Sequence, residues 1–198
     1  MYTETTAVKK EWWKTWESWK TCKKRTAPVC KFTIQSWDPA FVKGEESDYS
    51  ACTTWGVFHM NEDPNDVNII LLDVFQKRME FPELKEKAHD KYLEWKPDVV
   101  ILKAKGASAP LIFELEKMGI PVSEDAQSRT NNKFVLINSV VDLFQAGKVW
   151  VLDAQEAKDL IENMAAFPHA DYDDLTDSAV QALIRFSVVL RNTDGDQH

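Results

Sequence analysis

The first part of the chain alternates apolar and polar residues with the period of two that is typical of β-strands. Residues 31–38 show this alternation and predict a strand that ends at Asp38, before a proline. Residues 49–58 and 67–75 are rich in β-branched and aromatic residues and predict two further strands. Because only short polar turns separate the three segments, we expect them to be antiparallel neighbours in one sheet.

The rest of the chain alternates short apolar segments with helical patterns. The expected helices are residues 82–96, 110–118, 138–145, 154–166 and 174–190, and the expected strands are residues 99–102, 120–122 and 149–152. Short continuous apolar strands between helices are typical of buried parallel strands. The pattern therefore predicts an α/β domain with a mixed sheet, antiparallel on one side and parallel on the other. This order resembles that of RNase H/RuvC-like domains, which implies that the first and fourth strands lie side by side at the centre.

The N-terminal segment is basic and rich in tryptophan. Residues 8–21 predict a short helix, because Trp12, Trp16 and Trp19 recur at the spacing of one helical face. Such a helix would bind a membrane surface or a partner, or its indoles would pack on the rest of this domain or on a neighbouring one. We favour packing, and we divide the chain into a basic helical linker (1–30), the main domain (31–190) and a disordered tail (191–198).

Composition and charge narrow the class of protein. With 198 residues and 44% hydrophobic residues, the chain is long and apolar enough for one globular domain. The net charge of −8 argues against a protein that coats nucleic acid by bulk charge, although a local basic groove or an acidic metal site stays open. Apolar runs stay below the roughly 18 residues of a membrane span. Three cysteines without metal-type spacing favour reduced thiols in a cytosolic protein.

Aspartates occupy two places where a carboxylate has chemical meaning. Asp38 ends a predicted central strand, where burying a carboxylate is costly unless a cation compensates it. The loop before the last helix has four aspartates within seven residues: Asp171, Asp173, Asp174 and Asp177. Helix capping and the helix dipole explain Asp177 but not the whole group. Crowded carboxylates repel one another, and divalent cations such as Mg²⁺ or Mn²⁺, which favour oxygen ligands, relieve that repulsion. The two interpretations of the group are therefore helix capping and a metal site.

Other single residues are weaker candidates. His169 precedes the aspartates and would be a metal ligand, a proton shuttle or only a polar loop residue. Asp73 ends the third strand and would face either the site or solvent. Glycine-rich phosphate loops and serine or cysteine nucleophile motifs are absent from the sequence.

Five segments of the chain carry a resemblance to a known family. They are residues 34–40 (IQSWDPA), 47–58 (SDYSACTTWGVF), 71–84 (LLDVFQKRMEFPEL), 104–111 (AKGASAPL) and 173–183 (DDLTDSAVQAL). Together they resemble the nuclease domain of the large terminase subunit of tailed bacteriophages. The resemblance extends in order over roughly residues 9–190. It implies a metal-dependent endonuclease that cuts concatemeric DNA during genome packaging by two-metal phosphodiester hydrolysis with Mg²⁺ or Mn²⁺. Asp38 matches the first catalytic acid, and Asp173 matches a later one, with Asp174 beside it.

The sequence departs from the family pattern at the second acid. Lys103 stands where the family has a glutamate or aspartate after the fourth strand. A lysine cation is no ligand for Mg²⁺, so three alternatives are open: one weakly bound metal, another acid in its place (Asp73, Asp171 or Asp174), or an inactivating change. The resemblance also implies DNA contacts by Lys105, Arg129 and Lys133, although Asn132 and Leu136 replace the usual aspartate and arginine.

The resemblance further implies partners and a location. They are double-stranded DNA, the ATPase domain of the same polypeptide (joined through residues 10–19), the portal and the small terminase subunit, in the host cell cytoplasm and without a membrane. The alternative hypothesis is a catalytically silent DNA-binding or assembly module, in which the basic residues contact phosphate. Binding to phosphate of that kind weakens steeply with salt. A third and weaker hypothesis is an ATP-hydrolysing relative with the same fold.

Overall fold

The computed structural model describes residues 7–16, 26–40, 48–103, 108–125, 132–169 and 173–195. The strands are β1 (Lys14–Thr15), β2 (Phe32–Asp38), β3 (Ser50–His59), β4 (Val67–Lys77), β5 (Val99–Lys103), β6 (Val122–Asp125) and β7 (Val149–Val151). The α-helices are α1 (Phe81–Trp95), α2 (Ser108–Lys117), α3 (Lys133–Gln145), α4 (Lys158–Ala166) and α5 (Asp174–Gly195), with short 3₁₀ turns at Lys10–Trp12 and Met60–Glu62.

The described strands form one mixed, seven-stranded sheet in the order β1-β7-β4-β3-β2-β5-β6. β2, β3 and β4 are antiparallel neighbours, whereas β5 pairs with β2 and with β6 in parallel, and β7 pairs with β4 in parallel. The prediction of a mixed sheet with the first and fourth expected strands side by side is therefore confirmed, because β2 and β5 are those two strands.

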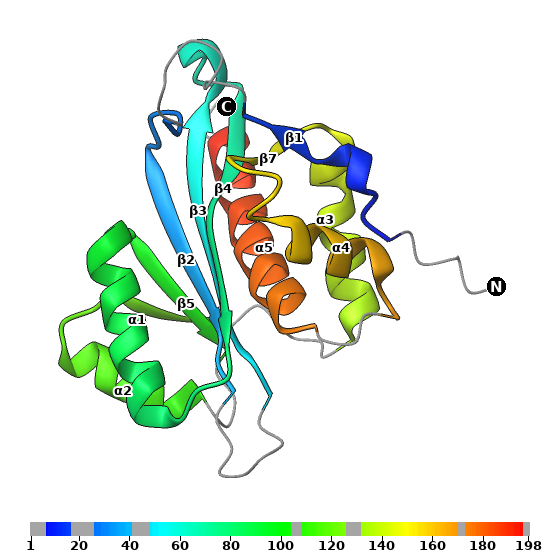
Figure 1. Ribbon diagram of the computed structural model, residues 1–198. Coiled ribbons are helices and arrows are strands. Elements are labelled where there is room, and N and C mark those ends of the chain that lie inside the picture. The colour runs from blue at the N-terminus through cyan, green and yellow to red at the C-terminus, as the bar shows by residue number, and fades with distance from the viewer. Residues whose placement is uncertain are drawn as a thin grey trace.

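Helices cover both faces of the sheet, with α1 and α2 on one side and α3, α4 and α5 on the other (Figure 1). Successive side chains of β2 point alternately to the two helical layers. Ile34 belongs to the core under α5, whereas Trp37 belongs to the core under α1 and α2. Both side chains are fully buried, and truncating a buried side chain of this size costs about 2–5 kcal/mol. The side chains of β2 thus bind the two layers together.

Two helices begin four or five residues away from where the sequence predicts. α3 starts at Lys133 rather than at residue 138, because the Asn132 side chain caps it by accepting a hydrogen bond of 3.0 Å from the backbone N–H of Phe134. α4 starts at Lys158 rather than at residue 154. The residues before it form a turn in which Asp153 accepts a hydrogen bond of 2.8 Å from the N–H of Gln155.

The prediction of a helix over residues 8–21 is wrong for the described part, residues 7–16. A 3₁₀ turn at Lys10–Trp12 is followed by β1, which pairs with β7. Trp13 packs into the core with ring centroids 6.3 Å from Trp55 and 4.9 Å from Phe144. Trp16 also packs on aromatic rings of the sheet, so the indole packing we favoured is confirmed for that residue. Hydrogen bonding to the open edge of β7 stabilises this segment as a strand, although its tryptophans recur with a helical period. Trp19 lies outside the described residues.

The C-terminal helix is longer than expected. Residues 191–195, which we assigned to a disordered tail, are the last part of α5, and residues 196–198 lie outside the described part. None of the described helices combines the length and the apolar composition that a membrane span requires.

Candidate active site

Asp38 is the last residue of β2, which lies between β3 and β5 in the sheet. Its backbone pairs with Ala51 of β3, and the residue before it pairs with Leu102 of β5. Side chains two residues apart share a face of a strand, so Asp38 lies on the same face as Ile34 and Ser36, which is the α5 side. The side chain is half-buried. β2 therefore places a carboxylate at the end of the strand, beneath the start of α5.

Two buried polar side chains hold α5 against the ends of β2 and β5. Ser178 Oγ donates a hydrogen bond of 2.8 Å to the carbonyl oxygen of Ser36. Gln181 Nε2 donates to Ser36 Oγ at 2.9 Å and also contacts the carbonyl oxygens of Trp37 (3.4 Å) and Ile101 (3.3 Å). Both side chains are buried. These contacts fix the N-terminal part of the helix over the end of β2.

Sequence reasoning missed Ser178 and Gln181 as residues that build the site. The signal was present in their spacing, because residues 174, 178 and 181 of a helix share one face. Polar residues on a helix face that must pack on a sheet are unusual, and they need hydrogen-bond partners there. The same spacing places Asp174 on the β2 side of α5, one turn before Ser178.

Asp174 lies in an environment that opposes its ionisation. Burial raises the pKa of its carboxyl group. The negative charges of Asp48 and Asp177 raise it further, whereas a hydrogen bond from its own backbone and the cation of Lys133 lower it. Desolvated carboxylates that repel one another are typical of sites that a cation completes.

Asp173 and Asp177 have a different neighbour. Lys133, the first residue of α3, forms ion pairs with both carboxylates, and its Nζ lies 3.3 Å from Asp177 Oδ2. The backbone N–H of Asp177 donates a hydrogen bond of 2.8 Å to the carbonyl oxygen of Asp173, which begins the helix. The predicted aspartate group is thus divided: Asp174 belongs to the β2 side, and Asp173 and Asp177 belong to the α3 side.

Asp73 is not brought to Asp38. Its Oδ2 accepts a hydrogen bond of 2.8 Å from Lys91 Nζ on α1, on the opposite face of the sheet from α5. A β-bulge between Thr54 and Trp55 causes this, because Thr54 pairs with Asp73 and Trp55 already pairs with Leu71. The extra residue turns Asp73 to the α1 face. The ion pairs with Asp73 and Glu94 raise the pKa of Lys91, against the effect of burial.

The remaining predicted residues divide into described and undescribed ones. His169 is exposed after α4, as expected of a polar loop residue. The backbone of Lys103 ends β5, one residue beyond Leu102, which pairs with Trp37. The side chain of Lys103 is outside the described part, and Lys105, Arg129 and Asp171 are wholly outside it.

The donor chemistry at this edge fits a divalent cation that prefers oxygen ligands. Asp38 and Asp174 are half-buried carboxylates on elements that the hydrogen bonds of α5 hold together. Within the described residues, no three acidic, histidine or cysteine side chains form a ready metal-binding group. Mg²⁺ is usually held by one or two carboxylates together with waters and substrate phosphates. A preformed cage of three protein ligands is therefore not required for it.

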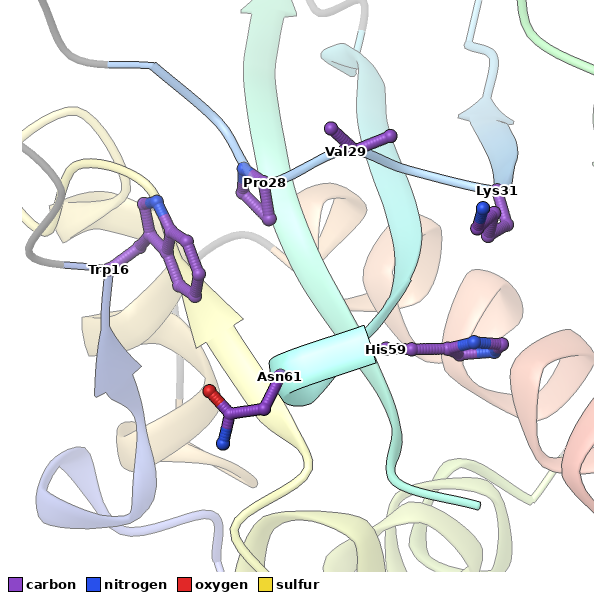
Figure 2. Close-up of a pocket in the computed structure, with 6 residues that line it drawn as sticks. All are labelled: Trp16, Pro28, Val29, Lys31, His59 and Asn61. Carbon is purple, nitrogen blue, oxygen red and sulfur yellow. The ribbon is translucent and has the colours of Figure 1, made fainter. Parts of the chain in front are cut away.

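A groove of about 570 Å³ lies at the opposite end of the strands, where β2 begins and β3 ends. Figure 2 shows the side chains that line it: Trp16, Pro28, Val29, Lys31, His59 and Asn61. These six residues include no carboxylate, so the groove lacks the donors that the Asp38 edge offers.

The chain is similar to one described family and to several solved structures. The family model for the terminase RNase H-like domain matches residues 35–186. The large terminase nuclease of thermophilic phage G20c with bound magnesium is 15% identical, with a TM-score of 0.56 over 77% of this chain and 80% of that chain. The large terminase nuclease domain of Thermus phage P74-26 is 16% identical, with a TM-score of 0.54 over 76% and 77%. Among curated proteins, no match was found.

Proposed function

We propose that this chain, which belongs to the family of terminase RNase H-like domains, is a metal-dependent endonuclease domain that cuts double-stranded DNA during genome packaging. One observation carries the proposal within that family. Ser178 and Gln181 hold α5 so that Asp174 starts beside the end of β2, where Asp38 lies. One carboxylate thus stands at the end of β2 and another at the start of the helix that packs on it.

Asp38 and Asp174 would hold the divalent cation in this proposal. A bound cation would polarise the phosphate and lower the pKa of a water nucleophile, and two such ions would stabilise both the attacking and the leaving oxygen. Asp38 is fixed by the middle strands of the sheet, and Asp174 is fixed through the hydrogen bonds one turn later on α5. Asp173, which matches a catalytic acid of the family, would contribute a further carboxylate from just before the same helix.

Mg²⁺ or Mn²⁺ is the cation we propose. Structures of the G20c terminase nuclease are described with bound zinc, with bound cobalt and with bound magnesium. The proposed ligands here are carboxylate oxygens, which suit Mg²⁺ and Mn²⁺ better than the softer metals that prefer sulfur.

DNA and the packaging machinery are the proposed partners. Lys105, Arg129 and Lys133 would contact the DNA phosphates, and the acidic edge would be screened by the bound cation. The ATPase domain of the same polypeptide, the portal and the small terminase subunit would surround the domain in the host cytoplasm. These partners follow from the family alone.

A second candidate function rests on Lys103. A cation at the end of β5, next to β2, would oppose metal binding at Asp38. The domain would then be a catalytically silent DNA-binding or assembly module. It would bind DNA with an affinity that falls steeply as salt rises, and it would not cut.

Incubation with supercoiled plasmid tests the proposal. We expect nicked and linear products in Mn²⁺ or Mg²⁺ and none in a metal chelator. The control is the Asp90→Asn variant, which removes an exposed acid on α1, away from the site. Absence of cutting by both the wild-type protein and a Lys103→Glu variant would contradict the nuclease, and salt-sensitive DNA binding without cutting would favour the second candidate.

A further inference from the structure

Among the described residues, Lys133 is a cation that pairs with the acidic start of α5. Its ammonium contacts Asp173 and lies 3.3 Å from Asp177 Oδ2. The lysine comes from the first turn of α3, so the two carboxylates on α5 receive their cation from a different helix. In the part that the structure describes, Lys133 thus supplies a positive charge to the aspartate group.

The geometry of this contact allows exchange. The side chains of Lys133 and Asp173 are 40% and 41% exposed, whereas that of Asp177 is 14% exposed. The pair with Asp173 is exposed on both sides, and pairs of this kind contribute little to stability, so breaking it costs little. The lysine stem is long and flexible, and water reaches the ammonium without any movement of the helices.

We propose that Lys133 is a resident counter-ion of the aspartate group, which a divalent cation displaces when it binds. This inference rests on the proposed metal site at Asp38 and Asp174. Asp174 is adjacent to the pair that Lys133 neutralises, and Lys133 acts electrostatically on its carboxyl group. The positive charge therefore keeps the acids compatible with one another in the metal-free protein and opposes the metal by direct repulsion.

Two effects of removing Lys133 oppose each other, and their sizes decide the expected result. Loss of the exposed ion pairs would loosen the first turn of α5 only slightly, because such pairs are weak. Loss of a cation near a site for a doubly charged ion would strengthen metal binding more, since the interaction scales with the product of the charges. Removal is therefore expected to tighten metal binding.

Isothermal titration with Mn²⁺ alone, without DNA, tests the inference. We expect Lys133→Met to lower the dissociation constant by about fivefold or more and to lower the melting temperature of the metal-free protein. Lys133→Arg keeps the charge and should stay close to wild type. The matched control is Lys148→Met, because Lys148 forms a similar ion pair with Asp66 (2.7 Å) at the start of β7, away from the site.

Chemical labelling of amines, read by mass spectrometry, tests the displacement itself. Labelling of Lys133 should rise when Mn²⁺ is added to the wild-type protein, and labelling of Lys148 should not. Unchanged labelling of Lys133, or equal or weaker Mn²⁺ binding by Lys133→Met, would overturn the inference, as would a failure of both proteins to bind Mn²⁺.

These results are independent of the nuclease assay. If plasmid is cut but Lys133→Met does not bind Mn²⁺ more tightly, the inference fails and the proposed function stands. If the variant binds Mn²⁺ more tightly and Lys133 is released, but no protein cuts plasmid, the counter-ion role stands and the nuclease function fails.

Discussion

Replacing Lys103 by glutamate is expected to raise the rate of plasmid cleavage in Mn²⁺ by about tenfold or more. Lys103 ends β5 one residue beyond Leu102, whose backbone pairs with Trp37, so its position is level with Asp38 on the neighbouring strand. The substitution replaces a cation by a carboxylate at this position of the strand. This change favours a bound divalent cation.

The control for this prediction makes the same charge change elsewhere. Lys117→Glu alters an exposed residue at the end of α2, on the other face of the sheet from α5 (Figure 1). Cleavage by this control should stay at the wild-type rate. If Lys103→Glu cuts no faster than wild type, then the end of β5 does not contribute to the reaction.

Replacing Asp38 by asparagine is expected to lower cleavage by about a hundredfold or more, in both the wild-type and the Lys103→Glu backgrounds. Asparagine keeps the shape of the side chain and one oxygen but loses the charge that holds a divalent cation. The fold should be retained, with a change in the free energy of unfolding of about 1 kcal/mol or less. Rates are measured on plasmid, and stability by urea denaturation.

The outcome that contradicts this prediction is specific. Residual cleavage within a few-fold of the parent protein would remove Asp38 from the reaction. A large loss of stability together with the loss of cleavage would show that Asp38 stabilises the fold and does not act in the reaction. The Asp90→Asn control would show whether the loss of any carboxylate has this effect.

The fold was predictable where local pattern and tertiary structure agree. The alternation of residues alone predicted β2, because its side chains pack alternately on two helical layers. Ile34 packs in one of these layers and Trp37 in the other. The central pairing of β2 with β5 followed from the order of the elements. The N-terminal segment was not predictable in this way. Trp13 has its place because β7 offers an open edge and because the rings of Trp55 and Phe144 pack against it, and all three are contributed by distant parts of the chain.

The candidate site was predictable in its residues but not in its arrangement. Asp38 and Asp174 stand out as acids at element ends. That Lys133 pairs with Asp173 and Asp177 depends on where α3 begins, and the cap at Asn132 that sets this start was missed. Side-chain direction was beyond the sequence at other positions too. Asp73 turns to α1 because of a β-bulge, and bulges leave no regular signature in the hydrophobic pattern.

The central claim is that carboxylates from β2 and from the start of α5 hold one divalent cation between them. Titration of Mn²⁺ into the wild-type protein and into an Asp38→Asn/Asp174→Asn variant, in the absence of DNA, tests it most directly. The account predicts that the wild-type protein binds Mn²⁺ and that the double variant binds it about tenfold more weakly or not at all. Equal affinity of the two proteins for Mn²⁺ would contradict it.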